Sequence, residues 1–213
     1  MSDELISKQV KNYLDSLVPA RPTELEAMEL YAKENGFPII GAACGYFCYQ
    51  MARMINAKHI FELGSGYGYS TAWFAQAVKE NGGGAVHHVV WDDGLSKKAQ
   101  AHLAALGLGE IVQYHVGEAV QSLREMPGQF DLIFNDIDKH GYPDALPVIK
   151  EKLGRGGVLI VDNMLWGGSI FDDSDHSPDT QGIREFTRQI TSDPTWIVTL
   201  VPIRDGLGVA FKK

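Results

Sequence analysis

Oxygen-bearing side chains follow two apolar runs of the chain, and their types and spacing suit the binding of a divalent cation. Asp136 follows the run at residues 131–135, and Asp162 and Asn163 follow the run at residues 158–161. We interpret each run as a buried strand. If the two strands are parallel neighbours, these side chains lie together at the strand carboxyl ends, where open α/β sheets bind ligands. Two carboxylates and an amide oxygen are hard donors, which suit Mg²⁺, Mn²⁺ or Ca²⁺ rather than a thiolate-bound metal.

A glycine-rich segment lies upstream, between a predicted strand at residues 59–63 and a predicted helix. Its glycines are Gly64, Gly66 and Gly68. Glycine lets the backbone approach a ligand closely, and the free N–H groups at the start of a helix attract anionic groups. The G-x-G-x-G spacing differs from the G-x-G-x-x-G of the dinucleotide fingerprint, so a nicotinamide oxidoreductase is a weaker interpretation. A cation site beside such a turn predicts a metal-assisted enzyme with a nucleoside cofactor.

The elements that must position these groups are strands that alternate with helices. Strands are predicted at residues 59–63, 86–91, 111–116, 131–135, 158–161, 196–202 and 208–211. Such alternation is typical of an α/β, Rossmann-like fold with a doubly wound, mostly parallel sheet. The last helix is expected at residues 181–192. The last two strands flank a turn at residues 204–207 and form an antiparallel C-terminal hairpin, which completes seven strands.

The N-terminal part of the chain is predicted to be helical. Apolar side chains recur at helical spacing at residues 3–16 and 45–56, and a capping box begins a helix at residues 23–36. The length of 213 residues fits one domain. We therefore expect a single domain over residues 1–213, in which a helical cap at residues 1–57 covers a sheet core at residues 58–213.

Composition and charge exclude several classes of partner. The formal net charge is −8, which disfavours a nucleic-acid partner because such proteins usually carry a basic patch. No apolar run is long enough to span a bilayer and the N-terminus has no apolar leader, so we expect a cytoplasmic protein with no membrane partner. The two cysteines, Cys44 and Cys48, lack the spacing of a zinc site. We interpret them as core thiols in a reducing compartment.

Three runs of the chain, taken together, resemble the cation-dependent O-methyltransferases of the caffeoyl-CoA and catechol type. They are Glu-Leu-Gly-Ser-Gly-Tyr-Gly-Tyr-Ser at 62–70, Phe-Asp-Leu-Ile-Phe-Asn-Asp-Ile-Asp-Lys-His-Gly-Tyr at 130–142 and Gly-Gly-Val-Leu-Ile-Val-Asp-Asn-Met-Leu-Trp-Gly-Gly at 156–168. The similarity covers nearly the whole chain. It implies an enzyme that uses S-adenosylmethionine and a divalent cation, Mg²⁺ above all, to methylate one hydroxyl of a vicinal diphenol. It also implies a homodimer that acts on a small phenolic molecule.

The resemblance implies roles for individual residues. Asp136, Asp162 and Asn163 are the implied metal ligands. Lys139 lies near the reacting hydroxyl, so Lys139 and Asp136 are the implied catalytic residues. Trp166 either walls the substrate pocket or merely packs. The residues implied to bind the cofactor are Glu62, Gly64, Gly66, Ser70, Asp92, Glu118, Ala119 and Asp136.

The chain departs from the family pattern in two places. The family carries an acid at the end of the second strand to hold the ribose hydroxyls, but here that position falls nearer Val90 than Asp92. Asp92 is therefore one candidate for the ribose contact, and Trp91 is an alternative that would pack on the adenine. The segment at residues 38–45 is less polar than the family's gating segment, so we expect the opening of the substrate pocket to differ from that of the family.

The chemistry of methyl transfer explains why these residue types are needed. A phenol has a pKa near ~10 and is a poor nucleophile at neutral pH. A divalent cation stabilises the phenolate and fixes its oxygen for attack on the methyl group. Lys139 can accept or stabilise the second proton if the nearby metal lowers its pKa.

Other interpretations stay open at this point. The acids could be simple strand-end residues, because Asp is common at caps and loops. The chain could methylate a different acceptor, or it could bind a cofactor without catalysis. The joint presence of two carboxylates, an amide and Lys139 favours an enzyme, because a scaffold gains nothing from clustering carboxylates.

Overall fold

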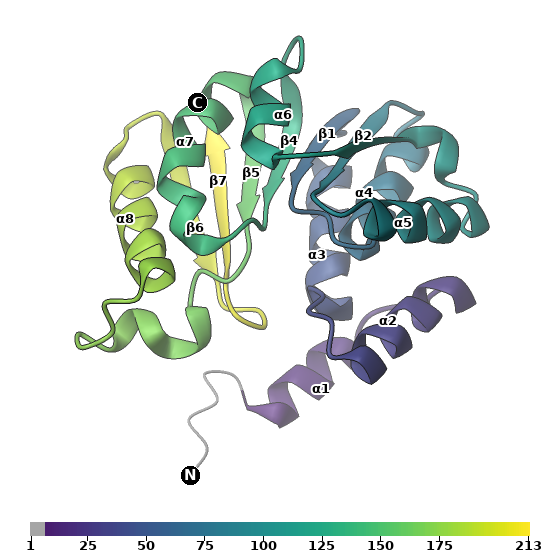
Figure 1. Ribbon diagram of the computed structural model, residues 1–213, viewed down its shortest axis with the longest axis horizontal. Coiled ribbons are helices and arrows are strands. Elements are labelled where there is room, and N and C mark those ends of the chain that lie inside the picture. The colour runs from purple at the N-terminus through teal and green to yellow at the C-terminus, as the bar shows by residue number, and fades with distance from the viewer. Residues whose placement is uncertain (1–6) are drawn as a thin grey trace.

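The computed structural model describes residues 7–213, and these form one sheet with helices on both faces (Figure 1). The strands are β1 (His59–Leu63), β2 (Ala85–Val90), β3 (Val112–Val116), β4 (Phe130–Asn135), β5 (Leu153–Val161), β6 (Trp196–Val201) and β7 (Leu207–Lys212). Their order in the sheet is β3-β2-β1-β4-β5-β7-β6. The first five strands are parallel, whereas β7 is antiparallel to both β5 and β6. The predicted fold class is therefore confirmed.

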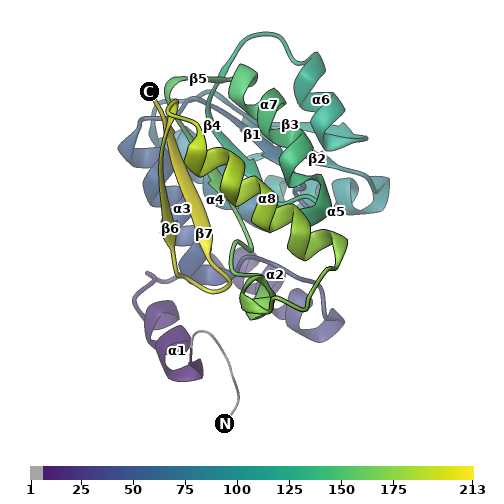
Figure 2. The same ribbon diagram turned by 90° about the vertical axis from the view of Figure 1, so that its left-hand side faces the viewer.

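The helices form a layer on each face of the sheet (Figures 1 and 2). The α-helices are α1 (Lys8–Ser16), α2 (Thr23–Asn35), α3 (Gly41–Met54), α4 (Tyr69–Glu80), α5 (Asp93–Ala105), α6 (Ala119–Glu125), α7 (Tyr142–Lys152) and α8 (Pro178–Ser192). Short 3₁₀ helices are η1 (Gly109–Ile111), η2 (Lys139–Gly141) and η3 (Trp166–Phe171). Helices α2 to α5 pack on one face, and α6 to α8 pack on the other.

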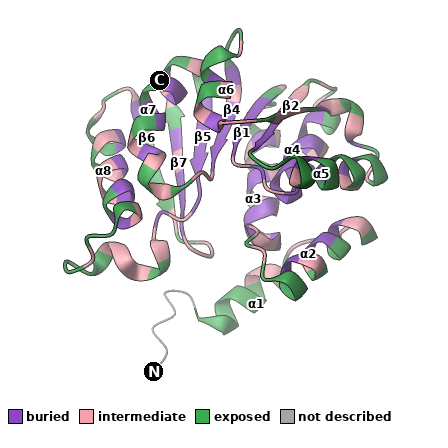
Figure 3. Ribbon diagram, in the orientation of Figure 1, coloured by how far each residue is buried: buried purple, intermediate pink, exposed green. Residues whose placement is uncertain are grey.

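Alternate residues of the central strands pack against these two helical layers. In β4, Leu132 and Phe134 pack with α2 to α5, whereas Ile133 packs with α6 to α8. Ile160 and Leu159 of β5 divide in the same way. Successive side chains of a strand point to opposite faces, so a strand covered on both faces is a continuous apolar run. Figure 3 shows this burial along the central strands, which explains why the sequence alone revealed them.

The register of the sheet aligns the ends of three central strands. Asn135 at the end of β4 pairs with Leu63 of β1 and with Val161 of β5. The residues that follow these three positions are Gly64, Asp136 and Asp162. The glycine segment and both candidate acids therefore leave the sheet side by side, at one edge.

Some element boundaries differ from those predicted. Helix α8 begins at Pro178 rather than at residue 181, because proline is well tolerated in the first turn of a helix. Strand β5 begins earlier than expected, at Leu153, and reaches β4 through a register shift near Phe130. No element was predicted where η3 lies. The expected N-terminal helix is observed from Lys8, and its predicted residues 3–6 lie outside the described residues.

The two cysteines lie on α3 and are buried, as predicted for core thiols. Burial raises the pKa of Cys44 to about 12, so this thiol is held in its neutral form. Across residues 7–213, no helix combines the length and the apolar character that a membrane span requires.

Candidate active site

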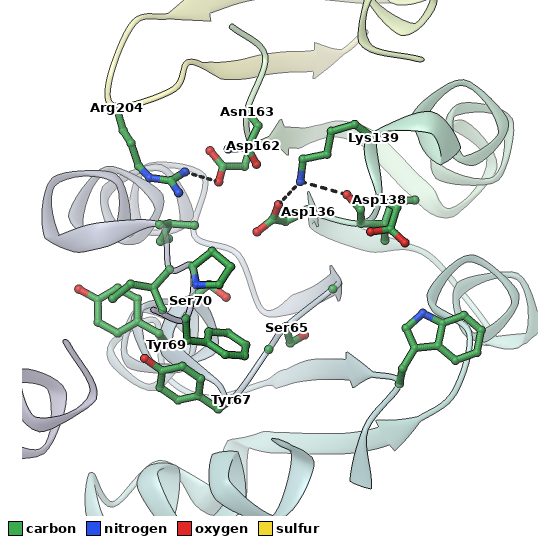
Figure 4. Close-up of a pocket in the computed structure, with 18 of the residues that line it drawn as sticks. Ser65, Tyr67, Tyr69, Ser70, Asp136, Asp138, Lys139, Asp162, Asn163 and Arg204 are labelled. Atoms are coloured by element: carbon green, nitrogen blue, oxygen red, sulfur yellow. Dashed lines mark hydrogen bonds and ion pairs between the residues drawn. The ribbon is translucent and has the colours of Figure 1, made fainter. Parts of the chain in front are cut away.

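A central cavity of about 520 Å³ opens at the carboxyl ends of β1, β4 and β5 (Figure 4). Its walls also include the segment between α2 and α3 and the turn between β6 and β7. A second cavity of about 420 Å³, which we call the side cavity, shares Gly64 and Asp136 with it and extends along residues 117–120. The two cavities thus meet where the glycine segment passes the end of β4.

Asp136 and Asp162 lie next to each other because they follow paired strands. The backbone N–H of Asp136 donates to the carbonyl of Leu63, and the N–H of Asp162 donates to the carbonyl of Asn135. The side chain of Asp162 is only 2% exposed, whereas that of Asp136 is 27% exposed. The structure therefore places one carboxylate at the base of the central cavity and the other nearer its opening.

Each carboxylate is paired with a cation of the chain itself. Lys139 Nζ donates to Asp136 Oδ1 over 2.8 Å, and Arg204 Nη1 donates to Asp162 Oδ2 over 2.8 Å. Burial raises the pKa of Asp162 to about 6, and the negative charge of Asp136 adds to that rise. Burial also raises the pKa of Asp136, against the lowering effect of Lys139. The site thus holds two acids that are costly to ionise unless cations lie beside them.

Asn163 presents its amide oxygen because its amide nitrogen is already committed. Asn163 Nδ2 donates to Asp205 Oδ2 over 3.0 Å, and the other oxygen of Asp205 accepts from the N–H of Gly167 over 2.7 Å. The backbone of Asn163 is left-handed, with φ of 58°, a conformation that asparagine tolerates better than most residues. The oxygen is the atom of this amide that remains for a ligand.

These donors fit a hard divalent cation. Asp162 Oδ1 is buried and has no hydrogen-bond partner among the described residues, and such an atom normally has one. A cation beside it would satisfy that oxygen. Residues 7–213 contain no cluster of three or more His, Cys, Asp or Glu side chains that could hold a metal. The amide of Asn163 would therefore have to be the third protein ligand.

Lys139 and Trp166 lie on the same wall of the central cavity. The ammonium of Lys139 is 5.8 Å from the ring of Trp166 and 5.5 Å from the ring of Tyr142, distances at which a cation is attracted to an aromatic face. The Lys139 side chain is 11% exposed. Trp166 lines the cavity and also packs against the core. Its role as a wall of a substrate pocket stays a prediction.

The glycine segment forms the opposite wall. Gly64 and Gly66 have φ of 86° and 52° and line the cavity with Ser70. A Cβ on Gly64 would lie 2.5 Å from the carbonyl oxygen of Asp136, so only glycine fits there. Ser65, which sequence reasoning did not select, ties this segment to the end of β2 through its Oγ, which accepts from the N–H of Val89 over 2.9 Å.

Glu62 lies beneath the glycine segment and not on a cavity wall. It is fully buried, and its Oε2 accepts a hydrogen bond from Thr71. Thr71 in turn contacts His88 Nδ1 at 3.0 Å. Burial raises the pKa of Glu62 to about 7, while hydrogen bonds from hydroxyl groups moderate the rise. The predicted cofactor contact of Glu62 would therefore require the glycine segment to move or would act through it.

The residues predicted to lie near the nucleoside divide into two groups. Glu118 and Ala119 line the side cavity, and both oxygens of Glu118 cap α6 through the N–H groups of Val120 and Gln121. Trp91 is 70% exposed and lines both cavities. Asp92 lines neither cavity. Its carboxylate accepts from the N–H of Leu95 and caps α5. Its ribose contact stays a prediction.

Sequence reasoning missed Arg204 and Asp205 as site residues. It identified this segment only as a hairpin turn, although two charged residues in a turn are a signal worth noting. The position of β7 beside β5 carries that turn over the end of β5. There Arg204 and Asp205 contact Asp162 and Asn163.

The chain belongs to the O-methyltransferase family, whose sequence model matches residues 24–213. The chain is 32% identical to a catechol O-methyltransferase from Niastella koreensis over 98% of both chains. It is 30% identical to a catechol O-methyltransferase from Mycobacterium tuberculosis over 78% of this chain and 76% of that protein. The predicted enzyme class, an O-methyltransferase, is confirmed.

Solved structures agree with this assignment. The O-methyltransferase TomG from Streptomyces achromogenes, which is involved in tomaymycin synthesis and was solved with S-adenosylmethionine, superposes with a TM-score of 0.88 at 25% identity over all of both chains. An O-methyltransferase from Bacillus cereus, solved with S-adenosylhomocysteine, superposes with a TM-score of 0.87 at 26% identity. That match covers 96% of this chain and 97% of the other.

Proposed function

We propose that this chain transfers a methyl group from S-adenosylmethionine to one hydroxyl of a vicinal diphenol, with the help of a divalent cation. One observation carries the proposal. Asp136, Asp162, Asn163 and Lys139 meet in the cavity that the glycine segment also lines. The similarity to two proteins named catechol O-methyltransferase supports the diphenol as acceptor.

Each of the two cavities would hold a different part of the cofactor. The side cavity, with Glu118, Ala119 and the exposed ring of Trp91, suits a nucleoside, because an aromatic face can stack on a base. The glycine segment and Ser70 would hold the amino-acid part. The bare backbone of Gly64 at the junction of the cavities permits close approach of the cofactor.

A divalent cation would be held by Asp136, Asp162 and Asn163, with Mg²⁺ the first choice for hard oxygen donors. When bound, it would supply the positive charge that stabilises a phenolate and fixes the two neighbouring oxygens of the diphenol.

The side chains around the cavity would transfer or stabilise a proton and pack against the acceptor. Lys139 lies beside Asp136 and is placed to take a proton from a hydroxyl of the acceptor or to stabilise the resulting oxyanion. Trp166, Phe37 and Ile39 present apolar surface to the same cavity. They would pack on an aromatic ring and exclude water from the reacting oxygen.

A methyltransferase for a different acceptor is the second candidate. The observation in its favour is Arg204, whose guanidinium occupies one oxygen of Asp162. An acceptor without a diol would leave this ion pair in place.

We also propose a homodimer in the cytoplasm. The edge of the sheet at β6 and β7 exposes Ile197, Leu200 and Phe211, which are 56%, 38% and 40% exposed. Ile197 and Phe211 are paired neighbours. An exposed edge with apolar side chains is a common site of association, and sedimentation velocity would test it.

The decisive experiment combines cofactor titration with a methyl-transfer assay. S-adenosylmethionine is titrated by calorimetry, and 3,4-dihydroxy phenols are then assayed with Mg²⁺, Mn²⁺ or EDTA, with matched monophenols as controls. We expect cofactor binding and methylation of diphenols that EDTA abolishes. Cofactor binding without diphenol methylation would favour another acceptor, and methylation that resists EDTA would exclude the cation.

A further inference from the structure

The buried carboxylate of Asp162 is held by an arginine from a distant part of the chain. Arg204 lies in the turn between β6 and β7, and its Nη1 is 2.8 Å from Asp162 Oδ2. Figure 4 shows the two side chains pointing toward each other across the cavity, while Lys139 points toward Asp136. The Arg204 side chain is 29% exposed, whereas that of Asp162 is 2% exposed. Arg204 is therefore the more accessible partner of this ion pair.

The position of Arg204 is fixed by the backbone around it. The N–H groups of Met164 and Leu165 donate to the carbonyls of Gly206 and Asp205 over 3.0 Å and 2.8 Å. Asp205 also accepts from the side chain of Asn163. Arg204 itself has a φ of 53°, a left-handed conformation that an arginine adopts only when its surroundings hold it there. The backbone of Arg204 is thus held where its side chain can reach Asp162.

The carboxylate that suits a divalent cation through its unpartnered Oδ1 is the one whose Oδ2 accepts from this guanidinium. A carboxylate that is nearly inaccessible to water needs a positive partner, and Arg204 supplies one. A divalent cation on Asp162 would bring two positive groups onto one buried carboxylate, and like charges at such distances repel strongly. The arginine and the metal are therefore alternatives at Asp162.

We propose that Arg204 is an internal cation that competes with the divalent metal for Asp162. The metal must displace the guanidinium from Asp162, so Arg204 lowers the affinity of this chain for metal and neutralises the carboxylate when the metal is absent. This inference rests on the proposed metal-dependent function.

A displaced guanidinium has room to move. Arg204 also lines a neighbouring cavity of about 430 Å³ between α1, α2 and the start of α3. The carboxylates of Asp15 and Glu29 line that cavity as well, each already paired with a cation of the chain. The side chain of Arg204 therefore borders both spaces, so that a rotation can move it from one to the other.

Metal binding can be measured without any turnover. Chelator-treated protein, free of S-adenosylmethionine and acceptor, is titrated with MnCl₂ at constant ionic strength, and free Mn²⁺ is followed by electron paramagnetic resonance. The variants are Arg204→Gly, which suits the left-handed backbone, and Arg204→Met, which keeps the bulk without the charge. Arg155→Gln is the control, because it removes the same charge at an exposed position in β5, away from the carboxyl end of that strand.

We expect both Arg204 variants to bind Mn²⁺ about tenfold more tightly than the wild type, or more, because a hydrogen bond to a charged group no longer has to be broken. Arg155→Gln should stay within about twofold of the wild type, because the exposed charge is screened. Unfolding temperatures of all variants report that they are folded.

The outcomes separate this inference from the proposed function. If the wild type binds Mn²⁺ and folded Arg204 variants bind it equally well, the competition is overturned while the metal site stands. If no folded protein binds Mn²⁺, both ideas fail. A wild type that binds weakly beside Arg204 variants that bind well would support both. On an Asp162→Asn background, Arg204→Met should no longer tighten Mn²⁺ binding, and this result would show that the tightening acts through Asp162.

Discussion

The two halves of the active site are built in different ways. The half that we propose to bind the cofactor, the cofactor half, is formed mainly by one continuous stretch, residues 62–70, whose positive φ glycines and buried serine fix a largely uncharged surface. The half that we propose to bind a divalent cation, the cation half, is assembled from three segments far apart in the sequence. It contains two ion pairs, Lys139 with Asp136 and Arg204 with Asp162.

Because of this difference, the two halves can respond to a ligand in different ways. A surface shaped by backbone conformation is preformed, and a ligand gains little by rearranging it. A site held by ion pairs can exchange partners, because an incoming cation replaces one that is already there. The halves meet where Gly64 packs on the backbone of Asp136, so substitutions can separate their contributions or damage both.

The largest effect is expected from the acids. Asp136→Ala and Asp162→Ala should lower turnover by about 10³-fold or more, because the charge that stabilises the phenolate is lost. The fold should persist, and Asp162→Ala should leave S-adenosylmethionine affinity within about threefold if the halves are independent. Steady-state kinetics and calorimetry measure the two effects. Asp173→Ala, at an exposed position that lines neither cavity, is the control. Wild-type activity in either acid variant would remove the metal assignment.

Lys139→Ala should lower turnover by roughly 10²-fold, the usual contribution of a positioned proton-transfer group. Cofactor affinity should change far less, because Lys139 belongs to the cation half. Single-turnover rates with saturating cofactor measure the effect, and Lys97→Ala, at an exposed position on α5, is the matched control. An unchanged rate would exclude Lys139 from the mechanism.

Gly64→Ala should damage both halves together. The new Cβ would meet the carbonyl oxygen of Asp136, and the φ of 86° disfavours any side chain. We expect a loss of about 2–3 kcal/mol in the free energy of unfolding, with weaker binding of both S-adenosylmethionine and Mn²⁺. Gly128→Ala has a similar φ of 80° but nothing within 4 Å, so urea unfolding should show a smaller loss. Equal losses in the free energy of unfolding of the two variants would mean that the contact with Asp136 does not contribute to the destabilisation.

The smallest effect concerns the pH dependence of stability. Burial raises the pKa of Glu62 from 4.5 to about 7, so the folded protein binds a proton more tightly than the unfolded chain. The stability that this group contributes to the folded state is fully present below pH ~4.5 and is lost as the pH rises toward ~7. Glu62→Gln should remove the part of the pH-dependent change in the free energy of unfolding that this group causes, roughly 1–3 kcal/mol. Urea unfolding at pH 5 and pH 8 tests this, and parallel slopes in both proteins would show that Glu62 does not titrate there.

Most of the fold and half of the candidate site could be predicted from the amino-acid sequence. Strands buried on both faces leave continuous apolar runs, so the parallel strands could be located directly. The acids at 136 and 162 follow two of those runs, and the rule that ligands bind at strand carboxyl ends was enough to predict their proximity. The cofactor segment is local, because its glycine spacing and the helix after it are encoded within a few residues.

The remaining contacts of the candidate site depend on how distant segments pack together. A hairpin at residues 196–212 is a local prediction, but its insertion with β7 against β5 depends on packing across the whole sheet. That insertion brings Arg204 onto Asp162. Asp92 shows the opposite case, because its carboxylate accepts a hydrogen bond from the N–H of Leu95, only three residues away in the sequence. Contacts between residues close in sequence are set by local conformation, whereas the ion pair over Asp162 exists only because the sheet brings distant segments together.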